Sequence, residues 1–524
     1  MNRSIRKTLA VATILAGVGL AACTDTTQEP SSTVTESNAF DDPRAYRGFL
    51  AKIYAGLAVS GQQGAAGQPD ISGIDEGFSQ YLRLYWEAQE LPTDEAVIAW
   101  GDVGLPEMNT QLWASSNSFV VAMYYRIFFQ VGMANEFLRQ TTEAKLAERN
   151  VTATVKATVQ TYRAEARFLR ALSYWHGIDL FGAIPLVTEE DLVNSAPPPQ
   201  STRALLVDYV VSELTAIRGE LPVAGGSGTY GRATDVAASM LLAHVYLNAE
   251  VYTGTPRYGE ALAAAEAVIA GPHSLDPILR RPFLADNHTS PEIIFPVIQD
   301  GLTTQTFGAM TFLVHAGCGG SMNAGALGVD GCWFGLRLKP EAYLRSVGDP
   351  RASYFHTDGQ SVDIASISDF SQGIGAPKFQ NVTSGGAPGK HLTHVDTDYP
   401  MFRLADAYLI YAEASLRGGG GTREQALAYV NALRQRAYGD TSGDITDPEL
   451  TLDFILDERG RELLWEGHRR PDLVRFGRFT GGDYVWAWKG GVAAGTSTQA
   501  HRDLYPLPAS ELVTNPNLTQ NPGY

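Results

Sequence analysis

The chain has little positive charge and, beyond Leu20, no long apolar run. Asp and Glu outnumber Lys and Arg by 57 to 40, which leaves a formal net charge of −17. Nucleic acid and anionic lipid surfaces both require concentrated positive charge, so both are excluded as partners. A transmembrane helix needs about 18 consecutive apolar residues, and no later segment has them. The body of the chain is therefore expected to be soluble.

The common catalytic motifs are also missing. The residues around Ser321 match G-x-S-x-G except at its last position. The stretch SGGAPGKH resembles a phosphate-binding loop, but Ser384 replaces its first glycine and His391 replaces the Ser or Thr that holds magnesium. There is no H-E-x-x-H, and the ten histidines lack metal-ligand spacing, so we predict neither a metal nor another cofactor. A glycosidase carboxylate pair has no fixed spacing and stays open.

The N-terminus has the features of an export signal. A basic cluster precedes an uncharged, mostly apolar run from Thr8 to Leu20, followed by Ala-Ala-Cys23. Small residues before a cysteine suit a lipoprotein signal peptidase, so we expect residues 1–22 to be removed and Cys23 to carry a lipid. Residues 23–43 are too polar to form a core and are expected to be a flexible tether. A plain secretory signal with an incidental cysteine is the alternative.

Residues 44–524 are predicted to form a mainly α-helical body. Apolar residues at helical spacing predict a helical scaffold over about 44–271 and 401–480. Frequent Gly, Pro, Asn and Asp between about 272 and 400 indicate a loop-rich part with short strands. Four prolines near the C-terminus predict an extended tail over 501–524.

A weak internal repeat supports the helical scaffold. The hexapeptides LAHVYL, from Leu242, and LADAYL, from Leu404, share four of six residues, and an Ala-Leu-Ala follows each about twenty residues later. Small alanines that face large Tyr and Leu side chains let two helices pack closely, as in tetratricopeptide-like hairpins. Two unrelated amphipathic helices are the alternative.

The segment from Cys318 to Trp333 is rich in glycine and bounded by the two cysteines of the body. An exported chain meets an oxidising compartment, where Cys318 and Cys332 could pair, but sequence separation does not decide the geometry. A disulfide would restrict a loop with five glycines and hold Trp333 in place. A purely structural or unpaired couple of cysteines is the alternative.

Four tryptophans lie in segments that are predicted to be loops or helix ends: Trp86, Trp100, Trp113 and Trp333. Aromatic rings pack against the C–H groups of sugars, and neighbouring Asp, Asn, Arg and Gln side chains can bind the hydroxyls. A position in the core is the alternative for each tryptophan, and we favour it for Trp113.

Charged residues recur near the end of the helical scaffold. Their spacing favours a structural network of ion pairs on helix surfaces and between helices over a catalytic role. The residues are Glu458, Arg459, Arg461, Glu462, His468, Arg469, Asp472 and Arg475.

Several long motifs, in order along nearly the whole chain, resemble the SusD/RagB family of outer-membrane nutrient-uptake lipoproteins. They are the lipobox, RAEARFLRALSYWHGIDLFGAIPLVTEE, MFRLADAYLIYAEA, ILDERGRELLWEGHRRPDLVRFGRF and LYPLPASELVTNPNLTQNPGY. The resemblance implies a fold with tetratricopeptide-like helix pairs and a non-enzymatic, loop-built face that binds glycans. It also implies an outer-membrane location, anchored only by lipid and facing the cell exterior, and a SusC-like TonB-dependent transporter that the lipoprotein covers as a lid.

Two segments look most similar to the starch-binding branch of this family: LPTDEAVIAWGDVGLPEMNTQLW and FGAMTFLVHAGCGGSMNAGALGVDGCWFGLR. The similarity implies an α-glucan ligand on an arc of aromatic residues. The implied glycan-binding residues are Trp100, Trp333, Phe307, Asp75 and Arg83. The chain departs from this branch at Val103, where an asparagine is expected, and at Phe307, where a tyrosine is expected.

Three functions are consistent with the sequence. The first is a surface lipoprotein that captures glycan for a transporter. The second is a lipid-anchored glycoside hydrolase with unrecognised carboxylates. The third is a lid for another glycan or a peptide, whose partner barrel carries the specificity. The aromatic and polar segments favour the first, and the resemblance carries most of the weight.

Overall fold

The computed structural model describes residue 40 and residues 42–71, 75–191 and 196–524. The chain divides into two units, residues 1–47 and residues 48–524. In the first unit, the ring of Phe40 stacks on that of Tyr46 with 5.2 Å between centroids. The expected signal peptide, the lipidation site Cys23 and nearly all of the expected tether lie outside the described residues.

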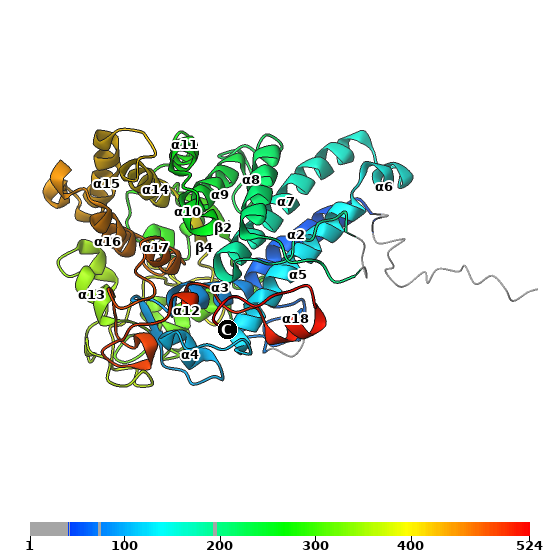
Figure 1. Cartoon of the computed structure of the whole chain (residues 1–524). Coiled ribbons are helices and arrows are strands. Elements are labelled where there is room, and N and C mark those ends of the chain that lie inside the picture. The colour runs from blue at the N-terminus through cyan, green and yellow to red at the C-terminus, as the bar shows by residue number, and fades with distance from the viewer. Residues whose placement is uncertain (1–39, 41, 72–74, 192–195) are drawn as a thin grey trace, which may run out of the picture. The chain divides into compact units, whose positions relative to one another are not determined.

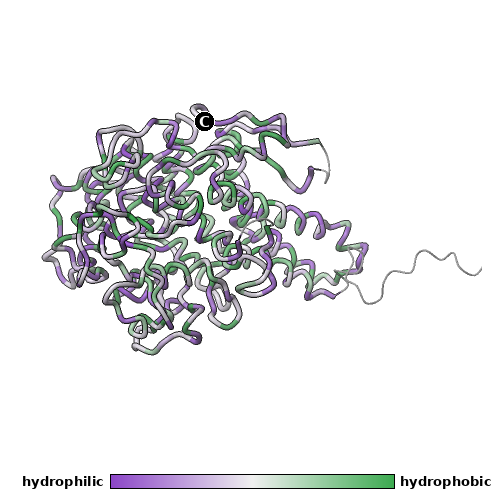
Figure 2. Tube along the Cα trace, turned by 90° about the horizontal axis from the view of Figure 1, so that it is seen from below, coloured by the Kyte–Doolittle hydropathy of each residue, from purple (hydrophilic) through white to green (hydrophobic). Residues whose placement is uncertain are grey.

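The second unit is mainly helical (Figure 1), which confirms the predicted fold class. Most long helices begin at a Thr or Asn whose side-chain oxygen accepts a hydrogen bond from the first turn, as Thr152, Thr202 and Thr234 do. Apolar stretches alternate with hydrophilic ones along the chain (Figure 2), as expected of helices with one buried face. None of the described helices is long and apolar enough to cross a membrane.

The helices of the first half are α2 (Arg44–Ala58), α3 (Tyr81–Glu90), α4 (Leu105–Thr110), α5 (Ser118–Gln140), α6 (Glu143–Glu148), α7 (Ala153–Phe181), α8 (Arg203–Ile217), α9 (Asp235–Leu247), α10 (Ala249–Thr253) and α11 (Tyr258–Ile269). Those that follow are α12 (Ala309–Ala316), α13 (Pro340–Arg345), α14 (Leu404–Leu416), α15 (Arg423–Tyr438), α16 (Leu452–Glu462), α17 (Arg469–Arg475) and α18 (Ala509–Thr514). Among the described residues, α12 and α13 are the α-helices of the loop-rich part.

Short strands form two antiparallel pairs in the described part of the chain. Strand β1 (Ala96–Ile98) pairs with β3 (Leu336–Leu338), and β2 (Ile293–Val297) pairs with β4 (Tyr399–Arg403). Each pair joins the loop-rich part to one of the helical parts. The first pair positions the candidate site described below.

The two hexapeptides of the internal repeat lie in α9 and α14. Helix α9 packs against α11 and α14 packs against α15, and these partner helices carry the two Ala-Leu-Ala segments. The hexapeptides also meet each other, because Nε2 of His244 lies 2.8 Å from Oδ2 of Asp406, the residue at the same position of the second hexapeptide. The repeat therefore marks two packed helix pairs, as predicted.

The predicted charge network exists, but it is buried inside the body. Glu462, at the end of α16, is 4% exposed and contacts the guanidinium groups of Arg351, Arg403 and Arg436. Arg459 bridges Asp406 and Asp472 at 2.9 and 2.7 Å. The predicted structural network of ion pairs is therefore present, both within helices, as between Arg475 and Asp472, and between helices. Its burial was not predicted, since sequence spacing shows which charges can pair and not what covers them.

The C-terminal tail is only partly extended, which corrects the prediction for residues 501–524. Pro508 lies immediately before α18, where a proline does not interrupt helical hydrogen bonding. On either side of this helix the tail is hydrogen-bonded to the C-terminal end of α7. Tyr505 N donates to Leu180 O at 2.8 Å, and Asn521 Nδ2 donates to Phe181 O at 2.9 Å.

Candidate functional site

Two partly exposed tryptophans from distant segments lie together at the end of the β1–β3 pair. Because the strands are antiparallel, the residues that follow β1 lie beside those that precede β3, which brings Trp100 close to Trp333. Trp100 Nε1 donates a hydrogen bond to Trp333 O at 3.1 Å, and the ring centroids are 6.4 Å apart. A side chain at Gly335 would collide with Trp100, since a Cβ there would lie 2.9 Å from its ring. Gly335 therefore permits the close approach.

A third ring, that of Phe307, extends the cluster from the segment before α12. Its centroid is 6.4 Å from that of Trp333. Trp333 is also supported by His315 of α12, whose ring stacks on it with 4.5 Å between ring centroids. Both ring nitrogens of His315 contact backbone oxygens, at 2.7 Å from Gly331 O and 2.9 Å from Thr393 O. These contacts fix the imidazole, which in turn fixes Trp333.

Arg83 of α3 supports Trp100. Its guanidinium carbon lies 5.6 Å from the Trp100 ring centroid, a cation–π distance. Arg83 is 6% exposed, and it donates to Glu87 Oε1 at 2.8 Å and to Gly77 O at 3.1 Å. Burial raises the pKa of Glu87, and the charge of Arg83 acts against that rise. This arrangement favours a positioning role for Arg83 over the direct ligand contact that the sequence predicted.

Asp75 is exposed and lies in the loop before α3. Its Oδ1 accepts a hydrogen bond from Gly77 N at 2.8 Å. Gly77 in turn lies against Phe307, because a Cβ at Gly77 would be 3.8 Å from the Phe307 Cβ. The structure thus brings together all five residues that the sequence singled out: Asp75, Arg83, Trp100, Phe307 and Trp333.

The other two tryptophan candidates belong to the core. Trp86 and Trp113 are 0% and 1% exposed. Trp86 lies within α3, not at a helix end, and donates to Trp465 O at 2.9 Å, while Trp113 donates to the hydroxyl of Tyr524 at 2.7 Å. The interpretation that Trp113 is a core residue is confirmed, and Trp86 is removed from the candidates.

Sequence reasoning missed two histidines of the site, His315 and His394. His394 lies beside Phe307, with 5.2 Å between ring centroids. Burial lowers the pKa of His394, which favours its neutral form. His315 has no partner at a recognisable sequence spacing. His394 lies three residues after His391, whose ring stacks on it with 5.2 Å between centroids, but this spacing does not point to the aromatic cluster. No motif could have found them.

A disulfide joins Cys318 to Cys332, immediately before Trp333. Backbone hydrogen bonds continue from it, since Trp333 N donates to His315 O at 2.8 Å and Gly335 N to Ala316 O at 2.9 Å. The glycine-rich loop is thereby closed at its base. The disulfide therefore restricts how far Trp333 can move.

Replacing both cysteines, Cys318→Ser with Cys332→Ser, is expected to lower the free energy of unfolding by up to about 3 kcal/mol. The bridge closes a short loop, and chain-entropy theory assigns this much to a loop of about 15 residues. Urea unfolding followed by tryptophan fluorescence measures the change. Dithiothreitol should destabilise the wild type and leave the double variant unaffected; equal stability of the two oxidised proteins would contradict the expectation.

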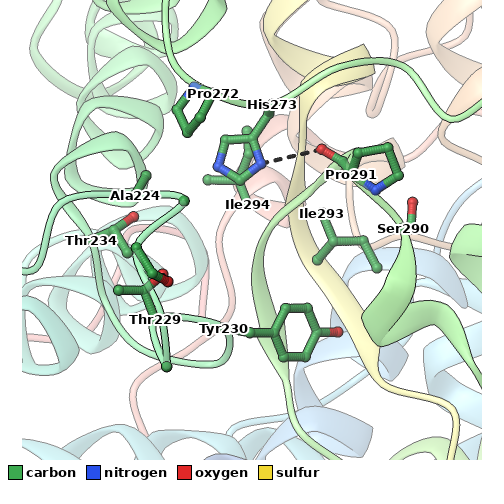
Figure 3. Close-up of a pocket in the computed structure, with 13 residues that line it drawn as sticks. Ala224, Thr229, Tyr230, Thr234, Pro272, His273, Ser290, Pro291, Ile293 and Ile294 are labelled. Atoms are coloured by element: carbon green, nitrogen blue, oxygen red, sulfur yellow. Dashed lines mark hydrogen bonds between the residues drawn. The ribbon is translucent and has the colours of Figure 1, made fainter.

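A cavity of about 280 Å³ lies between the α8–α9 connection and the segment that leads into β2 (Figure 3). Tyr230, His273 and Ser290 line it, and His273 Nδ1 lies 3.3 Å from Pro291 O. Its lining contains no Asp, Glu, Lys or Arg and none of the five residues above. The aromatic cluster is therefore a separate feature on the protein surface.

Comparisons with known proteins agree with one another. Residues 357–524 match the model of the SusD family. The chain is 35% identical to the starch-binding protein SusD of Bacteroides thetaiotaomicron, over 91% of this chain and 92% of that protein. It is also 26% identical to SusD-like protein P2 of Formosa agariphila, over 80% of this chain and 83% of that protein.

Solved structures show the same fold. A SusD homolog from Bacteroides thetaiotaomicron superposes with a TM-score of 0.73 at 19% identity and covers 93% of this chain and 98% of its own. Surface glycan-binding protein A of the same species, in complex with laminarihexaose, superposes with a TM-score of 0.69 at 20% identity, over 91% and 99%. By its sequence over nearly the full length and by its fold, the chain belongs to the SusD family.

Proposed function

We propose that the protein is a cell-surface lipoprotein that binds starch or malto-oligosaccharide and delivers it to a SusC-like TonB-dependent transporter. The observation that carries the proposal is the partly exposed cluster of Trp100, Trp333 and Phe307. His315 stacks on the Trp333 ring, and Arg83 packs against the Trp100 ring. Rigid aromatic faces with adjacent polar groups suit the C–H faces and hydroxyls of sugar rings. As a member of the SusD family, the protein is not an enzyme.

The shape of the cluster supports an α-glucan. The Trp100 and Trp333 rings are inclined by 43°, and those of Trp333 and Phe307 by 46°. The three rings therefore do not share one plane, which suits the coiled chain of an α-1,4-glucan better than a flat ribbon. The sequence similarity to a starch-binding protein points the same way.

The two departures from the starch-binding pattern reduce the polar part of the site. Val103 is 88% exposed and offers no amide, and Phe307 offers no hydroxyl. We infer that stacking supplies a larger share of the affinity than in a site with both polar groups. A lipid on Cys23 and the tether would hold the body at the membrane. Binding of the glycan would then shift the lipoprotein from an open position to a closed position over the transporter barrel.

Calorimetric titration of residues 24–524 with maltoheptaose, α-cyclodextrin and laminarihexaose tests the ligand. Heat is expected with the first two and not with the third. Heat with laminarihexaose alone would move the ligand to a β-glucan, and no heat with any of them would reject glycan binding at this site. Release of reducing ends from starch by the same protein would contradict a role limited to binding.

A further inference from the structure

Phe334, the residue after Trp333, is held at the surface. Its side chain is 49% exposed, and among the described residues it is the only Phe or Trp that is exposed to this degree. The other aromatic residues of the site are partly buried. A phenylalanine in this position adds little to the core, so its ring is available to a ligand.

The backbone of Phe334 adopts a left-handed conformation, with φ of +54°. This region is disfavoured for a bulky side chain and readily adopted by glycine, yet the chain carries a phenylalanine here in a segment rich in glycine. The conformation is fixed by the hydrogen bond from Phe334 N to Cys318 O, 3.0 Å, and by the disulfide two residues earlier. Strained residues of this kind concentrate at ligand sites.

A buried ring braces Phe334. Its centroid is 5.4 Å from that of Phe370 at an interplanar angle of 68°, an edge-type contact, and Phe334 remains 49% exposed. Phe370 is 8% exposed, and the guanidinium carbon of Arg337 lies 5.6 Å from its ring centroid. On another side it packs against Gly319, where a Cβ would come within 2.4 Å of the Phe370 ring. Phe334 is therefore an ordered surface ring with a rigid support.

The position of Phe334 continues the aromatic cluster. Its Cα is about 3.8 Å from that of Trp333, as for any neighbouring residues. Trp333 packs toward Phe307, His315 and Trp100, whereas Phe334 packs toward Phe370. The two consecutive rings thus contact different neighbours, and Phe334 extends the row of aromatic residues by one position along the chain.

We propose that Phe334 is a stacking position for sugar units beyond those on Trp100 and Trp333, and that it makes the site favour longer oligosaccharides. The proposal rests on the proposed function, because it assumes a glycan on the tryptophans. Its distinctive consequence is a dependence on chain length that the tryptophans alone do not produce.

Phe334→Gly tests the proposal without disturbing the loop, since glycine adopts the same φ freely. It is expected to weaken maltoheptaose binding by roughly three- to tenfold, the range for one aromatic contact, and to leave maltotriose binding within about twofold of the wild type. Phe334→Trp should keep the wild-type preference, and Phe334→Leu, which is apolar without a ring, should lose it. Val513→Ala, at an exposed apolar residue of α18, is the matched control and should change neither affinity.

The outcomes separate this proposal from the one on which it rests. Equal weakening of both sugars by Phe334→Gly, or no weakening of maltoheptaose, would overturn the role of Phe334 while leaving glycan binding intact. If the wild type binds neither sugar, the proposed function itself fails. The thermal midpoint of each variant, measured by circular dichroism, shows that a lost preference comes from the ring and not from unfolding.

Discussion

Glu462→Gln is expected to lower the free energy of unfolding by about 3–5 kcal/mol. Removing one member of a buried ion pair leaves its partners charged and uncompensated in a medium of low polarity. Here three guanidinium groups converge on one carboxylate: those of Arg351 and Arg403, at 2.9 and 2.7 Å, and that of Arg436. Urea unfolding monitored by circular dichroism measures the loss.

Glu136→Gln is the matched control, since Glu136 pairs with Arg139 on the surface, with side chains 38% and 26% exposed. An exposed pair contributes about 0–1 kcal/mol, so this variant should be close to the wild type. Similar losses in the two variants would show that burial of the network does not determine its contribution. A loss below about 1 kcal/mol for Glu462→Gln would contradict the expectation.

Acidification provides a second measurement on the same pair of proteins. Burial raises the pKa of Glu462, but Arg436, Arg403 and Arg351 outweigh it and hold the pKa well below its ordinary value of 4.5. A carboxyl whose pKa is depressed on folding stabilises the protein fully above its unfolded pKa and loses this contribution as the pH falls toward the folded value. The stability difference between wild type and Glu462→Gln should therefore shrink below about pH 4.5.

The helical scaffold could be predicted because its signals are local. Apolar spacing and the repeated hexapeptide each lie within a few residues, and the structure forms helices at both. Exposure could not be predicted in the same way. Trp86 and Trp100 were both expected near loops or helix ends. Trp86 is buried because α3, in which it lies, is buried along its whole length, and Trp100 is partly exposed after the end of β1.

The candidate site was found largely through resemblance, and its supports were not found at all. Asp75, Arg83, Trp100, Phe307 and Trp333 come from four separate segments, and the β1–β3 pair and the packing of α12 against α3 bring them together. His315 and Phe334 have no sequence signature of their own. Their roles depend on which backbone oxygens and rings surround them after folding, as the burial of Arg83 beside Glu87 also does.

Replacing Trp100 and Trp333 together by alanine is expected to weaken glycan binding by about 1000-fold. Aromatic anchors at the centre of a site commonly contribute about 2 kcal/mol or more each, and two of them correspond to about three powers of ten in affinity. Calorimetric titration with maltoheptaose measures the loss. Trp488→Ala is the control, because Trp488 is also partly exposed but donates to Ile364 O, in another part of the surface.

The two single variants distinguish a preorganised platform from two independent contacts. Trp100 donates to Trp333 O and its ring lies 6.4 Å from that of Trp333, so removal of either ring also loosens the other. The separate losses of Trp100→Ala and Trp333→Ala should therefore add to more than the loss in the double variant, by about 0.5 kcal/mol or more. Strict additivity would mean that each ring binds sugar without the support of its neighbour. Retention of wild-type affinity by the double variant would place the ligand elsewhere on the protein.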